Sequence, residues 1–169
     1  MVIRPEAATD VSAIDALLRA AFPSDGEARL VMALRNAGKL TLSLVAEAKD
    51  EVIGHAAFSP IAFDPDVAEV RAVGLAPLSV SEAFRRQGVG VALVERGLEA
   101  CRNLPCDAVF VLGELRYYRR FGFRSASDFG IANEYGAGDE FMVAELRPGT
   151  FAEAQAIAKY AAEFGLVDS

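Results

Sequence analysis

The stretch from Leu75 to Cys101 constrains the fold of this chain more than any other. An apolar run reaches Val80, the sequence Arg85-Arg86-Gln87-Gly88-Val89-Gly90 follows, and apolar residues then recur at helical spacing. This order predicts a strand, a glycine loop and an amphipathic helix. Glycine lets the backbone approach a ligand, and the first N–H groups of a helix have no partner within it. The loop therefore suits a phosphate group.

The spacing of the glycines separates three kinds of phosphate loop. A P-loop needs Gly-Lys-Ser/Thr at its end, and no lysine lies near Gly88. A dinucleotide fingerprint needs a third glycine or alanine where this chain has Leu93. The remaining pattern is Arg/Gln, two residues, Gly, one residue, Gly/Ala, which Arg85, Gly88 and Gly90 satisfy. It resembles the pyrophosphate loop of the GCN5-related N-acetyltransferase (GNAT) superfamily. An ordinary glycine loop before a helix is the alternative interpretation of these residues alone.

A second match to that superfamily lies downstream. The sequence from Ala108 to Gly113 predicts a buried strand, and Tyr117-Tyr118-Arg119-Arg120-Phe121-Gly122-Phe123 follows it. In the superfamily, a tyrosine four residues before a Gly-Phe pair faces the thioester, and Tyr118 has this spacing. The run is similar to the branch labelled YhbS-like, whose closing strand the sequence from Glu140 to Gly149 also resembles. The resemblance spans most of the chain.

The resemblance implies an acyltransferase of the EC 2.3.1 type that moves an acetyl group from acetyl-CoA to a primary amine in a ternary complex. The cosubstrate-binding residues that it implies are Leu78, Ser79, Val80, Arg85, Arg86, Gln87, Gly88, Val89, Gly90 and Val91. Tyr118 is implied as the general acid. An asparagine that the superfamily often carries has no counterpart here, where Gly113-Glu114 stand. A non-catalytic acyl-CoA-binding module and a protein that binds another diphosphate are the alternatives.

The base that accepts the proton of the amine is not singled out by the sequence. Glu27, His55 and Glu114 are candidates. Glu27 lies in one of two predicted helices that wall the acceptor site in the superfamily, although a glutamate in a first helical turn also suits the helix dipole. His55 is the only histidine, and a histidine in mid-strand is more often a core residue than a catalyst.

Composition limits the partners and the compartment. The net charge of −7 argues against a nucleic-acid partner and favours a cationic small-molecule or peptide amine. We expect a cytoplasmic protein without membrane contact, since the sequence has neither a membrane-length apolar segment nor a secretory signal. Cys101 and Cys106 fit neither a redox motif nor a zinc site, so buried thiols and no metal are expected. Whether the chain is a monomer or a homodimer stays open.

Periodicity and turn residues predict the remaining elements. Helices are expected over residues 11–22, 27–36 and 150–164, and Thr9-Asp10 is expected to cap the first of them. Strands are expected over residues 2–4, 40–48, 52–63, 67–80, 125–131 and 140–146. Gly74 and Pro77 predict a bulge in the strand over 67–80, which would splay it from the parallel strand near 108–112. These elements predict one α/β domain over residues 1–169, a twisted mixed sheet with a splayed central parallel pair and helices on both faces.

Overall fold

The structure, a computed structural model, describes residues 1–152 and 154–167. The described chain forms two compact units. The first comprises residues 1–59, 76–97 and 162–167, and the second comprises residues 60–75, 98–152 and 154–161. Strands β3 (Glu51–Asp64) and β4 (Ala72–Val80) contribute residues to both units. The assignment of residues 1–169 to a single domain stays a prediction.

The first unit contains an antiparallel meander. Strand β1 (Val2–Pro5) pairs with β2 (Leu42–Ala48), and β2 pairs with β3. The β2–β3 hairpin is the one that the sequence predicts. Lys49 and Asp50 turn it with φ angles of 52° and 63°, the left-handed conformation that a tight hairpin requires.

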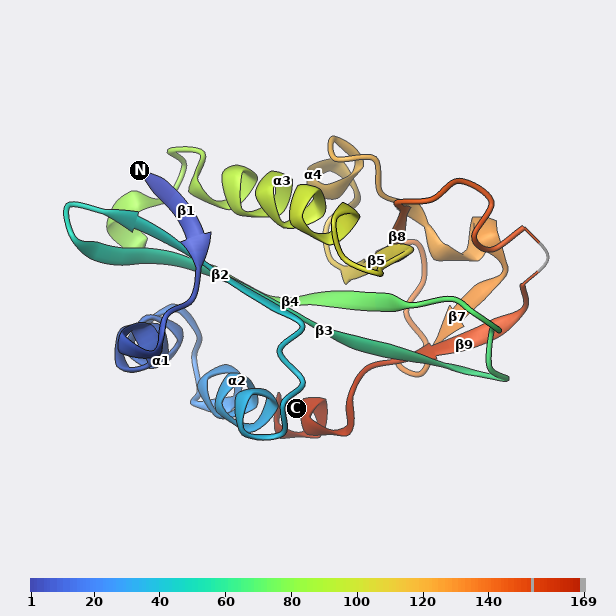
Figure 1. Ribbon diagram of the computed structural model, residues 1–169, viewed down its shortest axis with the longest axis horizontal. Helices are drawn as coiled ribbons and strands as arrows, with labels where there is room; N and C mark the ends of the chain where they lie inside the picture. Colours follow the sequence, from blue (N-terminus) through green and yellow to red (C-terminus); the bar gives the residue numbers. More distant parts are fainter. Residues whose placement is uncertain (153, 168–169) are drawn as a thin grey trace. The chain divides into compact units, whose positions relative to one another are not determined.

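Helices cover both faces of this meander, as predicted (Figure 1). Helices α1 (Val11–Ala21) and α2 (Gly26–Asn36) pack on one face through a buried cluster: Ile14, Leu18, Ala28, Val31, Val45 and Ala57. Helix α3 (Val89–Arg102) covers the other face. A side chain at Gly54 would contact Val89 and Leu93 of α3, and a side chain at Gly97 would overlap the ring of Phe58. These two glycines therefore allow the helix to lie close to β3.

The second unit contains the parallel pair of the mixed sheet. The parallel ladder joins Ala72–Gly74 of β4 to Ala108–Phe110 of β5 (Ala108–Leu112). Strand β8 (Phe141–Glu145) pairs antiparallel with β5 and with β6 (Arg124–Ser125). Strand β9 (Ala156–Lys159) pairs parallel with β7 (Ile131–Asn133) and antiparallel with β3. The predicted mixed α/β sheet with a central parallel pair is confirmed, whereas a bulge in β4 stays a prediction.

Two predicted elements are wrong. Residues 125–131 do not form one strand, because the 3-10 turn Ala126–Phe129 interrupts it, with Gly130 in the left-handed conformation (φ 76°). Residues 150–164 do not form a helix. They contain β9 and the start of the 3-10 turn Ala162–Val167, and Glu153 lies outside the described residues. The alanines of this segment favour a helix intrinsically, but Ala156 and Ala158 are buried between two pairing strands, so tertiary pairing overrides propensity.

Other details are confirmed or corrected at single residues. Cys101 and Cys106 are both buried free thiols, as predicted. The predicted cap of α1 differs, because Asp10 makes no side-chain cap bond to that helix. Its carboxylate instead accepts the N–H of Ala7 and ends a preceding 3-10 turn, Ala8–Asp10. None of the helices among the described residues is long and apolar enough to cross a membrane.

Candidate functional site

The glycine loop lies in the first unit, between β4 and α3. The N–H of Ser81 donates to Ile53 O at 2.8 Å, which fixes the point where the chain leaves the sheet. A 3-10 turn follows at Glu82–Phe84. Arg86 and Gly88 then adopt positive φ angles of 62° and 83°, and α3 begins at Val89. The tight reversal thus requires left-handed conformations that glycine adopts without strain.

The loop presents a surface that fits an anion. The first hydrogen bond of α3 runs from Ala92 N to Gly88 O, at 3.0 Å. The N–H groups that precede Ala92 therefore have no acceptor within the helix. A Cβ placed on Gly88 would meet no atom within 4 Å, so the space beside this backbone is open. Arg85 and Arg86 are exposed next to it. Open backbone, unpaired amides, the helix dipole and two guanidinium groups together suit a diphosphate.

The remaining predicted cosubstrate residues belong to the same unit as the loop. Ser79 is buried, whereas Leu78 and Val80 are half-buried at the end of β4. Gln87 is exposed, and its side-chain amide donates to Ala83 O at 3.3 Å. The structure therefore gathers the end of β4 and the loop in one unit, in the order that the sequence predicts.

Tyr118 lies in the second unit, on the short helix α4 (Leu115–Arg119). Its ring packs edge-on against the ring of Tyr117, with centroids 4.9 Å apart, and against the ring of Phe123 at 5.6 Å. A side chain at Gly113 would overlap the Tyr118 ring. Gly113 is thus the residue that lets this ring lie against the end of β5.

The surroundings of Tyr118 keep its phenol protonated. Burial, with a smaller contribution from Tyr117, raises the pKa of Tyr118 to about 12. The hydroxyl therefore remains a hydrogen-bond donor across the neutral range. The guanidinium group of Arg120 stacks on the Tyr117 ring, with its central carbon 4.8 Å from the ring centroid. Arg116 and Arg119 are exposed.

The three candidate bases occupy very different environments. Glu27 is half-buried in the first turn of α2, and Glu114 is exposed immediately before α4. His55 is 0% exposed on the face of β3 that α1 and α2 cover. The core position that mid-strand placement predicts for His55 is confirmed, whereas its part as the base stays a prediction.

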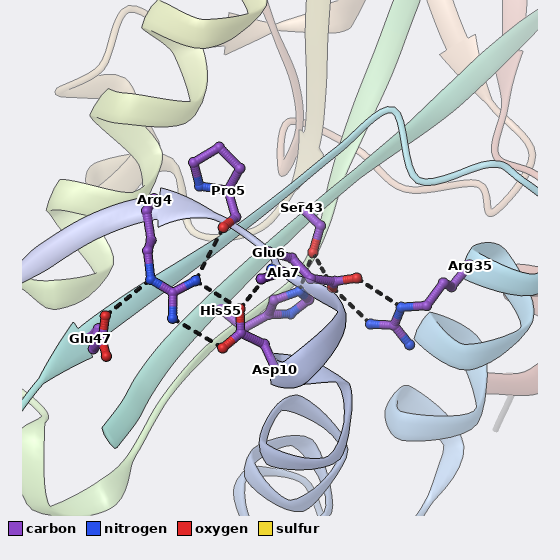
Figure 2. A network of polar contacts seen from close by, with 9 residues as sticks. All are labelled: Arg4, Pro5, Glu6, Ala7, Asp10, Arg35, Ser43, Glu47 and His55. Atoms are coloured by element: carbon purple, nitrogen blue, oxygen red, sulfur yellow. Dashed lines mark hydrogen bonds and ion pairs between the residues drawn. The ribbon is translucent and has the colours of Figure 1, made fainter. Parts of the chain in front are cut away.

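Figure 2 shows that His55 belongs to a polar network that the sequence did not predict. His55 Nε2 lies 2.8 Å from Ser43 Oγ, and the Ser43 hydroxyl donates to Glu6 Oε1 at 2.7 Å. Arg35 donates to both carboxylate oxygens of Glu6, at 2.9 Å and 2.8 Å. The hydrogen-bonded pairs lie 12 to 37 residues apart in the chain, so no local spacing signals the network.

The pKa shifts in this network follow from burial and hydrogen bonding. Burial lowers the pKa of His55 to about 4, so the imidazole is neutral, and its Nδ1 has no hydrogen-bond partner among the described residues. Burial opposes ionisation of Glu6, but the hydrogen bonds from Arg35 and Ser43 outweigh it and lower its pKa. A neighbouring ion pair shows the same effect of hydrogen bonding. Two hydrogen bonds from Arg4 help to lower the pKa of the buried Asp10 to about 2.

Comparison with known proteins adds to this geometry. Residues 11–123, about two thirds of the chain, match the profile described as "Acetyltransferase (GNAT) family". The chain belongs to this family. The matched residues include the glycine loop and Tyr118, and the resemblance to the YhbS-like branch is confirmed by relatives within the family.

Among the described residues, no group of histidine, cysteine, aspartate and glutamate side chains could hold a metal ion.

The similar family members extend over most of the chain. This chain is 46% identical to the N-acetyltransferase YhbS of Escherichia coli K12 over an alignment of 128 residues. The alignment covers 75% of each of the two chains. The crystal structure of E. coli YhbS in complex with CoA superimposes with a TM-score of 0.89 at 39% identity, over 97% of this chain and 91% of that one. A GNAT family acetyltransferase from Brucella melitensis, in complex with acetyl-CoA, has a TM-score of 0.79 at 33% identity, covering 96% and 97%.

Proposed function

We propose that this chain is an acetyl-CoA-dependent N-acetyltransferase that acts on a primary amine. Family membership supports the reaction class, and the relatives in complex with CoA and acetyl-CoA support the cosubstrate. The observation that carries the proposal is the loop before α3, where open backbone at Gly88 and the first amides of the helix lie beside Arg85 and Arg86. That arrangement would bind the pyrophosphate of the cosubstrate.

Each part of the predicted site has a distinct role in this proposal. The loop residues from Arg85 to Val91 bind the phosphates, and the backbone of Leu78, Ser79 and Val80 bonds the amides of the pantetheine arm. Tyr118 acts at the sulfur. Glu27, half-buried in the first turn of α2, is the proposed proton acceptor for the amine.

The reaction is a direct acyl transfer. The ammonium group of the acceptor first gives up a proton to Glu27 or water. The neutral nitrogen then bonds to the carbonyl carbon of the thioester, the carbon–sulfur bond breaks, and the acetamide forms. The departing sulfur takes the proton of Tyr118, which is then restored from solvent, and the nitrogen releases one proton to Glu27 or to water. Holding both reactants in attack geometry supplies much of the rate enhancement. In favourable cases this positioning lowers the activation barrier by up to about 7 to 11 kcal/mol. No covalent enzyme intermediate is needed.

The test of this proposal is release of CoA thiol from acetyl-CoA in the presence of a panel of primary amines. The panel contains spermidine, a lysine amide and a lysine-containing peptide, and mass spectrometry identifies the acetylated product. Release that depends on an amine and yields its N-acetyl derivative is expected. Tight CoA binding without release in the whole panel would instead support the acyl-CoA-binding module.

A second experiment tests the loop itself with a matched pair of variants. Gly88 and Gly38 both have positive φ angles, 83° and 71°, and a side chain on either would meet no atom within 4 Å. Gly88→Val and Gly38→Val should therefore both lose about 1 to 2 kcal/mol of stability from backbone strain. Only Gly88→Val should weaken CoA binding in titration calorimetry, by roughly 1.5 to 3 kcal/mol. Unchanged affinity in a folded Gly88→Val protein would remove the loop from the site.

A further inference from the structure

We propose that the 3-10 turn Ala162–Val167 positions the proposed base Glu27, by holding the first turn of α2 in place. This inference rests on the proposed function, in which Glu27 accepts the proton of the amine. The turn and α2 both belong to the first unit, although the residues just before the turn belong to the second. The matched family profile ends at residue 123, so the turn lies outside it.

The first contact between the turn and α2 lies at the start of the helix. Gly26 is the first residue of α2, and it is buried. A Cβ on Gly26 would lie 3.1 Å from Leu166 O and 3.3 Å from Val167 Cγ1. A side chain at position 26 would therefore require a shift of a few tenths of an ångström. Atoms of the turn thus lie directly against the backbone that carries the next residue, Glu27.

A second contact connects the turn to the other end of α2. Lys39 follows the helix by three residues, and its Nζ donates to Glu163 Oε1 at 2.8 Å. The backbone N–H of Lys39 donates to Leu34 O at 2.8 Å, so Lys39 is itself attached to the helix. Figure 1 shows the turn, in red, beside α2. A displacement of the helix relative to the turn would disrupt at least one of the two contacts.

The chain just before α2 gives its first turn little support. Asp25, the N-cap residue, makes no side-chain hydrogen bond to the helix, and residues 23–25 are exposed. The N–H of Gly26 donates to Ser24 Oγ at 3.3 Å, which is long for such a bond. A missing cap weakens the start of a helix. The packing of Ala28 in the core and the contacts of the turn at Gly26 are therefore what fixes the first turn.

The position of Glu27 matters because a base must lie within hydrogen-bond reach of the proton that it accepts. A misplacement of about 1 Å can cost roughly 10²-fold in rate, so one of a few tenths of an ångström should cost about 4- to 10-fold. In this inference Leu166 and Val167 touch neither the amine nor acetyl-CoA. They are positioning residues that act through the backbone of α2.

The test compares two alanine substitutions that differ in what the new methyl group meets. Gly26→Ala places a Cβ against Leu166 O and Val167, whereas Gly165→Ala, within the turn, places one where no atom lies within 4 Å. Neither glycine is in the left-handed conformation. With the panel amine that is acetylated fastest, Gly26→Ala should lower kcat by about 4- to 10-fold, although alanine favours a helix more than glycine does. KM for acetyl-CoA should not change, and Gly165→Ala should behave as the wild type.

A double-mutant cycle distinguishes positioning from a general effect on the structure. Glu27→Gln removes the base with little change in side-chain shape, so it should itself lower kcat. If the turn acts through Glu27, Gly26→Ala should cost almost nothing further when glutamine already occupies position 27. If the two substitutions instead lower kcat by factors that multiply, the turn does not act through Glu27 and the inference is wrong, while the transferase stands.

Hydrogen exchange gives a readout that needs no activity. The N–H of Arg29 donates to Asp25 O at 2.9 Å and closes the first turn of α2. Val167→Ala removes packing from this turn, so exchange of the Arg29 amide should become about 2- to 10-fold faster, with no change in Gly165→Ala. Unchanged exchange in Val167→Ala would overturn the inference even if amines are acetylated. If the wild-type protein acetylates no amine, the proposed function and the role of Glu27 both fail, and faster exchange then supports only the hold of the turn on α2.

Discussion

Tyr118 is held by aromatic packing that would suit either a core residue or the proposed proton donor. The contacts that hold it are ring contacts with Tyr117, Phe121 and Phe123, and the space for the ring exists because residue 113 is glycine. Burial of the ring also keeps the phenol protonated. The same packing that suits an aromatic core residue therefore also suits a proton donor, so composition alone cannot separate the two roles.

Replacing Tyr118 with phenylalanine separates them. Tyr118→Phe keeps the ring packing and removes the donor, so turnover should fall by about 10²-fold, the low end for a general acid because a thiolate leaves well unaided. CoA affinity and stability should change little. Tyr117→Phe, in the adjacent ring, is the control and should retain activity. Wild-type turnover in Tyr118→Phe, with acyl transfer shown to limit the rate, would return Tyr118 to the core.

His55 makes a separate prediction about stability. Its pKa is about 4 in the folded chain, whereas the ordinary value of a histidine is near 6.5. Between these two pH values the unfolded chain binds a proton that the folded chain does not. Stability is therefore complete above pH ~6.5 and falls by up to about 1.4 kcal/mol per pH unit as the pH decreases toward ~4. Asp10, with its pKa lowered to about 2, loses its contribution only at lower pH.

The measurement is the free energy of unfolding by denaturant between pH ~7 and ~5. His55 is the only histidine, so His55→Gln should be less stable at neutral pH but should lose most of the slope in this window. Equal slopes for the two proteins would show that His55 titrates normally in the folded chain.

At the scale of elements, the approach of α3 to β3 depends on Gly97. Glycine within a helix is ordinarily destabilising by about 0.5 to 1 kcal/mol relative to alanine. Here a Cβ would overlap the fully buried ring of Phe58, so the packing requirement outweighs helix propensity.

Gly97→Ala should therefore destabilise the protein by about 1 to 3 kcal/mol, the usual cost of overpacking a core. Phe58→Leu makes room at the same place, so in a double-mutant cycle the combined variant should lose less stability than the sum of the single variants. Thermal or denaturant unfolding of the four proteins provides the measurement. Strict additivity would mean that α3 shifts away from β3 instead of clashing with it.

For the whole molecule, net charge should influence how the proposed amine acceptor meets the protein. A surface with a net charge of −7 attracts a polycation over a distance set by the Debye length, which shrinks from about 30 Å at 0.01 M salt to about 3 Å at 1 M. KM for spermidine should therefore rise with salt while kcat stays constant. KM for an amine that is uncharged at the assay pH should be insensitive to salt, and an equal response of both amines would exclude electrostatic attraction.

Much of the fold could be predicted because its signals are local. The helices at 11–21, 26–36 and 89–102, the hairpin around Lys49-Asp50 and the strand at 108–112 each carry their own periodicity or turn residues. The glycine loop before α3 was predictable for the same reason, since the reversal places Gly88 in the left-handed conformation that glycine adopts without strain. The error at 150–164 arises where a non-local partner decides: β9 exists because β3 and β7 pair with it.

The sequence by itself therefore determined the mixed α/β class and the family, because these depend on residue types at short spacing, and it supplied the predicted cosubstrate loop and Tyr118. Only the tertiary structure decided which distant residues meet. It placed Glu6, Arg35, Ser43 and His55 in one buried network, and it placed Tyr160 against Gly74 with Glu134 and Tyr135 beside it. Such contacts follow from strand register and from which face a side chain occupies, and no periodicity in the chain encodes the register between strands that are far apart in sequence.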